Sequence, residues 1–464
     1  MSGIGLKKYD RRDFLKKSGA AAMMVCLGNQ PSELSSQKHR MLKITSINSN
    51  FEREPLVRPF GFKGGYLTEL WQSISKLSTG QYSGIGLGTQ SVLYGDSDLF
   101  AQYPEAAGNA LMYSVTQRAL QMVKDIPFDN PVRLTEQLIP ALIPVARQLT
   151  DNPGVSINFI LNSLISVDNA AWMVYARENG FNTYDAMIPE KFKPALAHKN
   201  PKVAVMFQVS YGMPVSDIVR AVEQGYFVIK IKTGQPGSQS EMLEKDKVRL
   251  AQIHEALKNK TSGHTPDSRI LYTLDSNGRY EKRETLEKLI DHAHKIGAFS
   301  HILFIEEPLP DTNDEEVGGL GIRIAADERA NDEASTLKCI ELGYRGIILK
   351  GVAKTLSLSL KIASIAHEHQ IPCACSDLTV NPILVDWQKN LAARLTPFPG
   401  LSMGLLETNG DMNYKNWDQM RQYLPKPDAA WANVKRGVFE LGPDFYETSG
   451  GIFDSPVHYE KMFK

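Results

Sequence analysis

Two lysines alternate along the apolar stretch YFVIKIKTG, which runs from Tyr226 to Gly234. With the two-residue period of a β-strand, the side chains of Lys230 and Lys232 lie on one face and the isoleucines between them on the other. The flanking apolar residues indicate a central strand of an α/β protein, where both faces are usually covered. Because a buried ammonium group is unfavourable unless an anion receives it, the sequence must supply carboxylates nearby.

Acidic residues end the next three strand-like runs along the chain. Asp275 ends RILYTLD, Glu306 ends HILFIE and Asp327 ends IRIAAD, while a further lysine, Lys350, ends YRGIILK. In a barrel of parallel strands, chemistry is located at the carboxyl ends of the strands. Strands two and six of a ring of eight lie on opposite sides, so the three acids are predicted to share one cup with a lysine on either side.

Such a group of acids would repel itself without a cation. An all-oxygen cup suits Mg²⁺ better than zinc, because no histidine or cysteine joins it. We therefore expect Asp275, Glu306 and Asp327 to be magnesium ligands. Glu307 follows Glu306 directly, and only one of two adjacent strand residues can face the lumen. Any one of these acids alone could be a helix cap or an ion-pair partner, so the prediction depends on their occurrence on successive strands.

The second half of the chain alternates short apolar runs with helices of ordinary length. This rhythm predicts a (β/α) barrel rather than an open sheet. The preceding block reads as strands from Met41 to about Asp98 and as helices from Glu105 to Glu178, which is an α+β pattern. The eight strand-like runs are KVAVMFQVSYG, FVIKIKTG, RILYTLDSNG, HILFIEEPLP, IRIAADERA, YRGIILKG, IPCACSDLT and LSMGLLETNG.

Four segments are predicted. Residues 1–40 form an export signal and linker, 41–165 an α+β capping domain, 166–410 the catalytic barrel, and 411–464 a C-terminal segment that packs back on the cap.

The composition favours a protein that acts on a small molecule. The chain has 464 residues, is 42% hydrophobic and has a formal net charge of zero, so it lacks the basic footprint of nucleic-acid binding. No apolar run approaches the roughly twenty residues that span a bilayer. A homo-oligomer is compatible with this composition. The four cysteines, Cys26, Cys339, Cys373 and Cys375, make no disulfide framework and are expected to be buried thiols.

The N-terminal stretch YDRRDFLKKSGAAAMMVCLGN resembles a twin-arginine export signal. Arg11 and Arg12 precede a short apolar stretch, although Asp10 stands where serine or threonine is usual. Export would place the folded protein in the periplasm. Because no clear cleavage site follows, an uncleaved signal would leave it tethered to the membrane. The alternative is a basic amphipathic tail.

Together these strand ends resemble the enolase superfamily, and within it the muconate-lactonising and dipeptide-epimerase branch of the mandelate racemase/muconate lactonising enzyme family. KIK, LDSNG, IEEP, AADE and the strand-six lysine match that branch in order. The resemblance implies a modified (β/α)7β TIM-like barrel with an N-terminal α+β cap and Mg²⁺ on the three acids. It also implies that Lys232 and Lys350 act on opposite faces of a substrate carboxylate. The strand-seven run CSDLT lacks the histidine of the mandelate-racemase-like members.

Three departures from the motifs of this branch leave the identity of the substrate open. Arg329 stands where the branch has serine, GVAKTL replaces the paired glycines after Lys350, and strand eight lacks the Asp-x-Asp with which dipeptide epimerases hold a substrate ammonium. Glu407 and Asp411 are the nearest acids to that position.

The expected activity is a Mg²⁺-dependent racemase or epimerase that removes the proton α to the carboxylate of an amino-acid-like or dipeptide substrate, through an enediolate and two lysines. The segment REPLVRPFGFKGG, with Phe60 and Phe62, lies where the family folds a lid. Candidates for substrate or supporting contacts are Lys230, Asn277, Glu328, Asp377 and Glu407.

Three alternatives stay open. A dehydratase or cycloisomerase of the same family would use one lysine as base. A glycoside hydrolase also uses paired carboxylates at barrel strand ends, but it gives the two lysines no role. A periplasmic binding protein could keep the barrel only as a scaffold.

Overall fold

The computed structural model describes residues 41–464. The predicted export signal at residues 1–40, with Cys26, lies outside the described residues.

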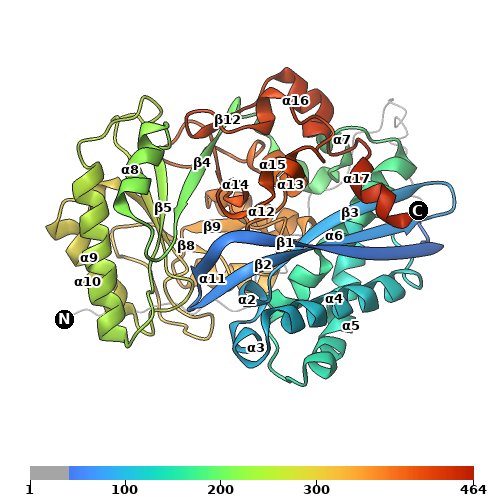
Figure 1. Ribbon diagram of the computed structural model, residues 1–464, viewed down its shortest axis with the longest axis horizontal. Helices are drawn as coiled ribbons and strands as arrows, with labels where there is room; N and C mark the ends of the chain where they lie inside the picture. Colours follow the sequence, from blue (N-terminus) through green and yellow to red (C-terminus); the bar gives the residue numbers. More distant parts are fainter. Residues whose placement is uncertain (1–40) are drawn as a thin grey trace, which may run out of the picture. The chain divides into compact units, whose positions relative to one another are not determined.

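The described chain begins with a three-stranded antiparallel sheet in the order β1-β2-β3 (Figure 1). Lys63 and Gly64, with φ of +48° and +77°, form a two-residue turn between the first two strands. Two positive φ angles match the twist of a tight hairpin. The hairpin therefore carries Phe60 and Phe62 close to its tip. The strands are β1 (Ser46–Phe62), β2 (Gly65–Ser78) and β3 (Ser83–Gln90).

A helical layer packs on this sheet, with α6 at its centre. Every residue of α6 from Asn158 to Ala176 is buried. Glycines on β3 allow the close approach, since a Cβ at Gly86 would lie 2.1 Å from Ala170 N. The helices are α2 (Val92–Gly95), α3 (Ser97–Gln102), α4 (Glu105–Val123), α5 (Pro131–Thr150), α6 (Ile157–Asn179), α7 (Tyr184–Met187) and the 3-10 helix η1 (Glu190–Leu196).

The domain boundary predicted between residues 165 and 166 falls inside α6. This helix is continuous and packs against β2 and β3, so it belongs to the cap. The barrel begins only at the first parallel strand, β4, at Lys202.

Eight parallel strands close into a barrel, because β11 pairs with β4. The prediction of a TIM-like barrel with an α+β cap is confirmed. All eight predicted runs contain a strand. They are β4 (Lys202–Val209), β5 (Val228–Lys232), β6 (Leu271–Asp275), β7 (Ile302–Glu306), β8 (Ile324–Ala326), β9 (Gly346–Leu349), β10 (Cys373–Cys375) and β11 (Gly404–Glu407).

The alternation of strand and helix is interrupted once. Residues 307–323, between β7 and β8, contain no helix. Prolines at 308 and 310 and glycines at 318, 319 and 321 oppose helix formation there. The other connections carry α8 (Val215–Glu223), α9 (Gln239–Leu257), α10 (Arg283–Lys295), the 3-10 helix η2 (Phe299–His301), α11 (Glu333–Glu341), α12 (Leu356–Glu368) and α13 (Pro382–Ala392).

The C-terminal segment contacts both the cap and the barrel. Tyr414 forms a bridge with Leu56 of β1, and Asn50 Nδ2 donates to Met462 O at 3.2 Å. A short strand, β12, pairs antiparallel with β4 of the barrel. The segment comprises α14 (Gly410–Asn413), α15 (Trp417–Arg421), η3 (Ala430–Ala432), β12 (Val438–Glu440), α16 (Pro443–Thr448), η4 (Ser449–Gly451), α17 (Val457–Glu460) and η5 (Lys461–Phe463).

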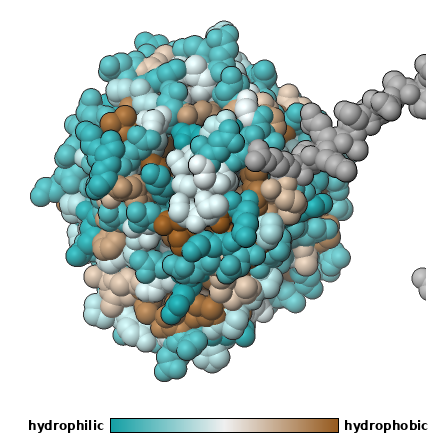
Figure 2. Space-filling model, turned by 90° about the vertical axis from the view of Figure 1, so that its right-hand side faces the viewer, coloured by the Kyte–Doolittle hydropathy of each residue, from teal (hydrophilic) through white to brown (hydrophobic). Residues whose placement is uncertain are grey.

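Apolar side chains fill the interior. On the face shown in Figure 2, hydrophilic side chains surround smaller groups of apolar ones. The thiols of Cys339, Cys373 and Cys375 are buried and free, as predicted. Within residues 41–464, no helix is long and apolar enough to cross a membrane.

A buried carboxylate joins the cap to the barrel. Asp168 on α6 accepts hydrogen bonds from Thr135 of α5 at 2.8 Å and from the backbone and hydroxyl of Ser357 on α12. Trp172 Nε1 donates to the same Ser357 hydroxyl at 3.1 Å. Burial raises the pKa of Asp168 from 3.8 to about 6, despite these hydrogen bonds. The folded protein therefore holds this proton more tightly than the unfolded chain does.

This raised pKa predicts a loss of stability as the pH rises. The contribution of protonated Asp168 is fully present below about pH 4 and is lost as the pH passes through about 6. The free energy of unfolding should fall by roughly 2–3 kcal/mol between pH 4 and pH 7, relative to the non-titrating Asp168→Asn variant. Chemical denaturation at both pH values measures the difference. Parallel pH profiles for the two proteins would contradict it.

Candidate active site

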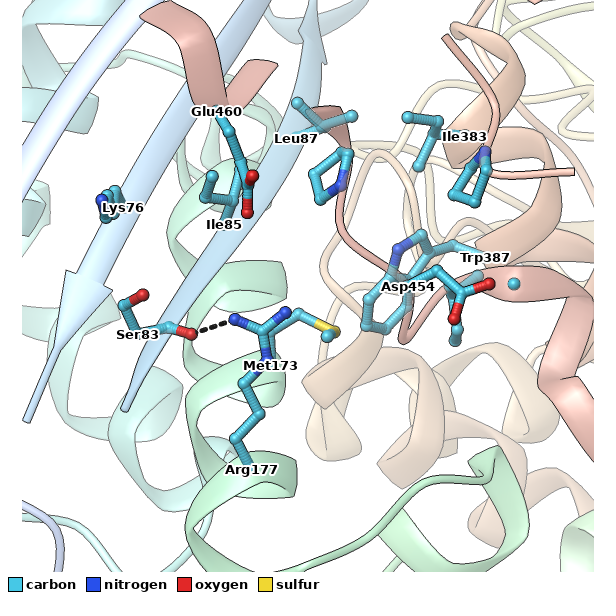
Figure 3. Close-up of a pocket in the computed structure, with 14 residues that line it drawn as sticks. Lys76, Ser83, Ile85, Leu87, Met173, Arg177, Ile383, Trp387, Asp454 and Glu460 are labelled. Carbon is cyan, nitrogen blue, oxygen red and sulfur yellow. Dashed lines mark hydrogen bonds between the residues drawn. The ribbon is translucent and has the colours of Figure 1, made fainter. Parts of the chain in front are cut away.

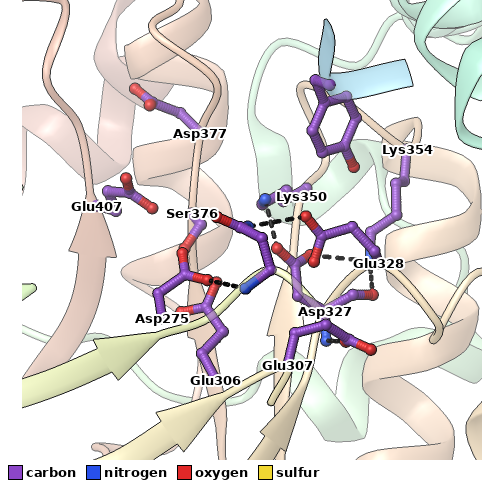
Figure 4. Close-up of polar contacts among 12 residues, drawn as sticks. Asp275, Glu306, Glu307, Asp327, Glu328, Lys350, Lys354, Ser376, Asp377 and Glu407 are labelled. Carbon is purple, nitrogen blue, oxygen red and sulfur yellow. Dashed lines mark hydrogen bonds and ion pairs between the residues drawn. The ribbon is translucent and has the colours of Figure 1, made fainter. Parts of the chain in front are cut away.

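The strand register brings the predicted acids together at one end of the barrel. Asp275 pairs with Lys232 on one side and with Glu306 on the other. Asp327 and Lys350 directly follow β8 and β9. The side chains of all three acids are 0% exposed. Three carboxylates from adjacent strands are thus buried side by side (Figure 4).

Lys230 compensates the charge at the centre of this group. Its Nζ lies 3.0 Å from Asp275 Oδ2, 2.8 Å from Glu306 Oε1 and 2.7 Å from Glu407 Oε2. Burial lowers the pKa of Lys230, but these carboxylates outweigh it and hold the pKa well above its usual range. Lys230 is therefore a fixed ammonium group, and its donors are directed at protein carboxylates.

Lys232 lies at the edge of the cluster. Its Nζ is 2.5 Å from Asp275 Oδ2 and 3.0 Å from Asn277 Oδ1. Asn277 Nδ2 in turn donates to Glu328 Oε1 at 3.0 Å. The ammonium group also lies 5.8 Å from the centre of the Phe62 ring of the cap hairpin. Asn277 and Glu328 therefore support Lys232 from the barrel side, while the cap covers it.

Lys350 stands on the opposite strand of the ring. It forms an ion pair with Asp327 and lies 4.8 Å from the centre of the Tyr94 ring. Lys354, four residues later in the turn before α12, donates to Asp327 O at 2.7 Å and approaches Asp327 Oδ1 at 3.3 Å. Burial lowers the pKa of Lys350, but the charge of Asp327 outweighs it and holds the pKa well above its usual range.

The three acids differ in their tendency to ionise. Burial favours the neutral form of each, but Lys230 and Lys232 hold the pKa of Asp275 well below its usual range. In the same way Lys350 and Lys354 lower the pKa of Asp327 to about 2. For Glu306, burial and then the charge of Asp275 prevail over Lys230 and raise the pKa well above its usual range. Lys230 therefore does not fully offset the burial of Glu306 and the negative charge of Asp275 beside it.

Glu307 serves a different purpose from its neighbour. It accepts from Asp327 N at 2.6 Å and from Arg329 Nε at 3.0 Å. Burial and the charge of Glu328 raise its pKa to about 8, against the opposing charge of Arg329. Its backbone φ of +38° turns the chain sharply after β7. Arg329, which stands where the resembled branch has serine, is the buried ion-pair partner of Glu307.

The two lysines line one cavity with an empty volume of about 390 Å³. The cap contributes an apolar and aromatic wall, including both phenylalanines of the β1–β2 hairpin. The barrel contributes polar side chains from strands on either side of the ring. The lining residues are Phe60, Phe62, Leu67, Tyr94, Gln208, Lys232, Asn277, Glu328, Lys350, Asp377, Leu378, Thr379, Glu407 and Asn409.

A polar network covers the side formed by β4, β10 and β11. Gln208 Nε2 donates to Glu407 Oε1 at 2.8 Å, and Asn409 donates to Gln208 Oε1. Thr379 Oγ1 donates to Asn409 Oδ1 at 2.7 Å. Asp377 lies beside this network, and burial together with the charge of Glu407 raises its pKa to about 7.

The donor set fits a hard divalent cation. In residues 41–464, no group of three histidine, cysteine or acidic side chains is already disposed to hold a metal ion. Lys230, Lys232 and Lys350 form ion pairs with these carboxylates. Even so, Glu306 Oε2 is buried without a hydrogen-bond partner, and all the oxygens belong to carboxylates, which Mg²⁺ prefers. Asp275, Glu306 and Asp327 are the residues that would hold the ion.

Residues 215–403 match the family model described as enolase C-terminal domain-like. This part of the barrel is therefore similar to the enolase C-terminal domain-like family. The resemblance predicted from the strand-end residues is confirmed. No curated protein matches the chain in sequence.

Solved structures of this superfamily share the fold at low sequence identity. A mandelate racemase/muconate lactonizing protein from Herpetosiphon aurantiacus gives a TM-score of 0.60 at 15% identity, over 86% of this chain and 96% of that one. A dipeptide epimerase from Cytophaga hutchinsonii, complexed with Mg and a dipeptide, gives 0.60 at 16% identity over 86% and 94%. An N-succinyl Arg/Lys racemase from Bacillus cereus gives 0.57 at 15% identity over 81% and 89%.

Several residues that line the cavity or contact its lining were not predicted from the sequence. Tyr94 reaches the site from α2 of the cap, and Lys63 from the hairpin tip, where its Nζ lies 3.4 Å from Glu328 Oε1. Only the folding of the cap over the barrel reveals them. Gln208 could have been found, because it lies near the end of the first barrel strand. Lys354 could have been found from its spacing of four residues after Lys350 on the way into α12.

A second cavity lies away from the lysines, with an empty volume of about 550 Å³ (Figure 3). Apolar side chains such as Ile85, Met173 and Trp387 line it together with Arg177, which donates to Ser83 O. None of the predicted catalytic or metal-binding residues takes part in it. The chemistry is therefore assigned to the cavity between Lys232 and Lys350.

Proposed function

We propose that this protein is a Mg²⁺-dependent racemase or epimerase that exchanges the proton α to a substrate carboxylate. The observation that carries the proposal is the placement of Lys232 and Lys350. They stand on opposite strands of the ring and line the same cavity, with three buried carboxylates on the strands between them. A planar intermediate bound between two such groups can lose a proton on one face and gain one on the other.

The chain's own residues have separate roles in this scheme. One lysine accepts the α-proton as a neutral amine while the other, as an ammonium group, donates a proton from the opposite face. For Lys350 to accept a proton, a cation on Asp327 would have to offset the carboxylate charge that raises the pKa of Lys350. Asn277 fixes Lys232, and Asp327 fixes Lys350. Phe60, Phe62 and Tyr94 exclude water and so strengthen the electrostatic interactions within the cavity.

When bound to Asp275, Glu306 and Asp327, Mg²⁺ would supply positive charge that stabilises the negative charge developing on the substrate carboxylate. The fixed ammonium group of Lys230 keeps these ligands in place, because it bonds two of the three.

The similar structures support an enzyme of this superfamily, and several of them are named as epimerases or racemases. Identities near 15% do not carry the reaction across, so the isomerase assignment depends on the geometry of the lysines. The substrate we propose is an amino-acid-like or dipeptide carboxylate.

Two alternatives predict different behaviour. A dehydratase or cycloisomerase would use one of the two lysines as base and the other only as a fixed cation. A binding protein that keeps the barrel as scaffold needs neither. The retention of both lysines and all three acids, each buried and ion-paired, favours an enzyme over a scaffold.

Proton exchange in deuterated water separates these possibilities. A two-base enzyme should exchange the α-proton of both substrate enantiomers, as followed by NMR with Mg²⁺ present. Lys232→Ala should lose exchange from one enantiomer and keep some from the other, and Lys350→Ala should show the opposite pattern. The exposed Lys288 provides a control, since Lys288→Ala should leave both exchanges unchanged.

Exchange from a single enantiomer, with a dehydrated or cyclised product, would replace the epimerase by the alternative within the family. Binding without exchange of either enantiomer would favour the scaffold.

We also propose export through the twin-arginine-like sequence at residues 1–40, which carries Arg11 and Arg12. A fusion of these residues to a reporter should reach the periplasm, and the double replacement Arg11→Lys with Arg12→Lys should keep it in the cytoplasm. Cell fractionation measures the distribution. Equal export of both fusions would refute the proposal.

A further inference from the structure

The acids that line the cavity are not equally available to a substrate. Both oxygens of Glu407 are already occupied. Oε1 accepts from Gln208 Nε2 at 2.8 Å, and Oε2 accepts from Lys230 Nζ at 2.7 Å. Glu328 Oε1 accepts from Asn277 and lies 3.4 Å from Lys63 Nζ, so the charge of Glu328 is already paired with a cation, although its Oε2 has no hydrogen-bond partner. Although Glu407 lies closest to the position where dipeptide epimerases carry their strand-eight acids, its oxygens are committed to the protein.

Asp377, after β10, differs from both, because it forms no ion pair with any of residues 41–464. Its Oδ1 accepts from Thr379 N at 3.0 Å, but its Oδ2 is buried and has no hydrogen-bond partner among the described residues. The residue is 4% exposed. A buried carboxylate oxygen without a donor is unfavourable by itself, so this atom is suited to a donor that arrives with the ligand. The same cavity holds Lys232 and Lys350.

The position of Asp377 is fixed by the backbone. Thr379 has a φ of +66°, a left-handed conformation, and its N–H holds Asp377 Oδ1 while its hydroxyl joins the network through Asn409. In Figure 4 Asp377 and Glu407 lie together, apart from Asp327 and Glu328. Their proximity is electrostatically significant, because the charge of Glu407 contributes to raising the pKa of Asp377 to about 7. A cation next to Asp377 Oδ2 would relieve this repulsion.

We infer that Asp377 binds a protonated amino group of the substrate. The substrate class is therefore a carboxylate that also carries a free ammonium group, such as an unblocked dipeptide or amino acid, and not an N-acylated amino acid. Acylation removes the positive charge, and an N-succinyl group would bring a further carboxylate toward two acids. The ammonium site would thus be on strand seven instead of strand eight. The reaction of this substrate rests on the proposed function, whereas the ammonium site rests on the contacts of Asp377 alone.

Paired ligands test this inference. We would measure binding of a panel of free dipeptides and amino acids, and of their N-acetyl counterparts, by calorimetry with Mg²⁺ present. The wild type should bind the free forms more tightly. Asp377→Asn should weaken binding of the free forms by roughly 10–100-fold, as expected for loss of a charge-assisted hydrogen bond, and should change binding of the acetylated forms by less than about threefold. The amide keeps the acceptor for Thr379 N–H, and a thermal melt checks that the variant is folded.

Asp411→Asn is a matched control. Asp411 also follows strand eight, but it is exposed and does not line the cavity, so binding of both ligand forms should be unchanged. Wild-type binding of the free forms that is no tighter than that of the acetylated forms would overturn the inference. An equal loss of affinity for the free and the acetylated forms in Asp377→Asn would also overturn it. Proton exchange on the bound ligands is measured separately. Selective binding of the free forms without proton exchange would contradict the proposed reaction but would still support the ammonium site.

Discussion

The rest of the site depends on three carboxylates that are completely buried on adjacent strands. Asp275, Glu306 and Asp327 could not remain ionised in the interior without nearby positive charge. The barrel supplies it from the strands on either side, with Lys230 at the centre of the group and Lys232 and Lys350 at its edges. The separation of the two outer lysines follows from the closed ring, since the acids occupy the strands between them.

The cap completes the site by covering these charges with aromatic rings. The Phe62 ring lies 5.8 Å from the ammonium group of Lys232, and the Tyr94 ring lies 5.1 Å from that of Lys63 and 4.8 Å from that of Lys350. Aromatic faces attract cations and also exclude water, so the interactions of the ammonium groups with the carboxylates are screened less than they would be in solvent. The buried contacts of Asp168 with α5 and α12 hold the cap to the barrel that it covers.

The sequence predicts the barrel and its charged residues well, because both obey short-range rules. Strand ends can be read from apolar runs, and the period of two places Lys230 and Lys232 on one face. The cap's contribution could not be read in this way. The boundary inside α6 was misplaced because that helix is buried all round and gives no amphipathic signal at the edge of the domain. Tyr94 joins the site only through a contact between domains, and the availability of Asp377 compared with Glu407 depends on which oxygen each neighbouring side chain occupies.

We propose that the three buried acids form a magnesium site, and that the lysines leave the negative charge around Glu306 only partly offset. Calorimetric titration of the metal-free protein with Mg²⁺ tests it most directly, because this measurement needs no substrate. The wild type should bind one ion per chain, and Glu306→Gln, which keeps the shape of the side chain but removes its charge, should weaken binding at least about tenfold. Absence of Mg²⁺ binding by the folded wild type, or equal affinity in the variant, would contradict the account.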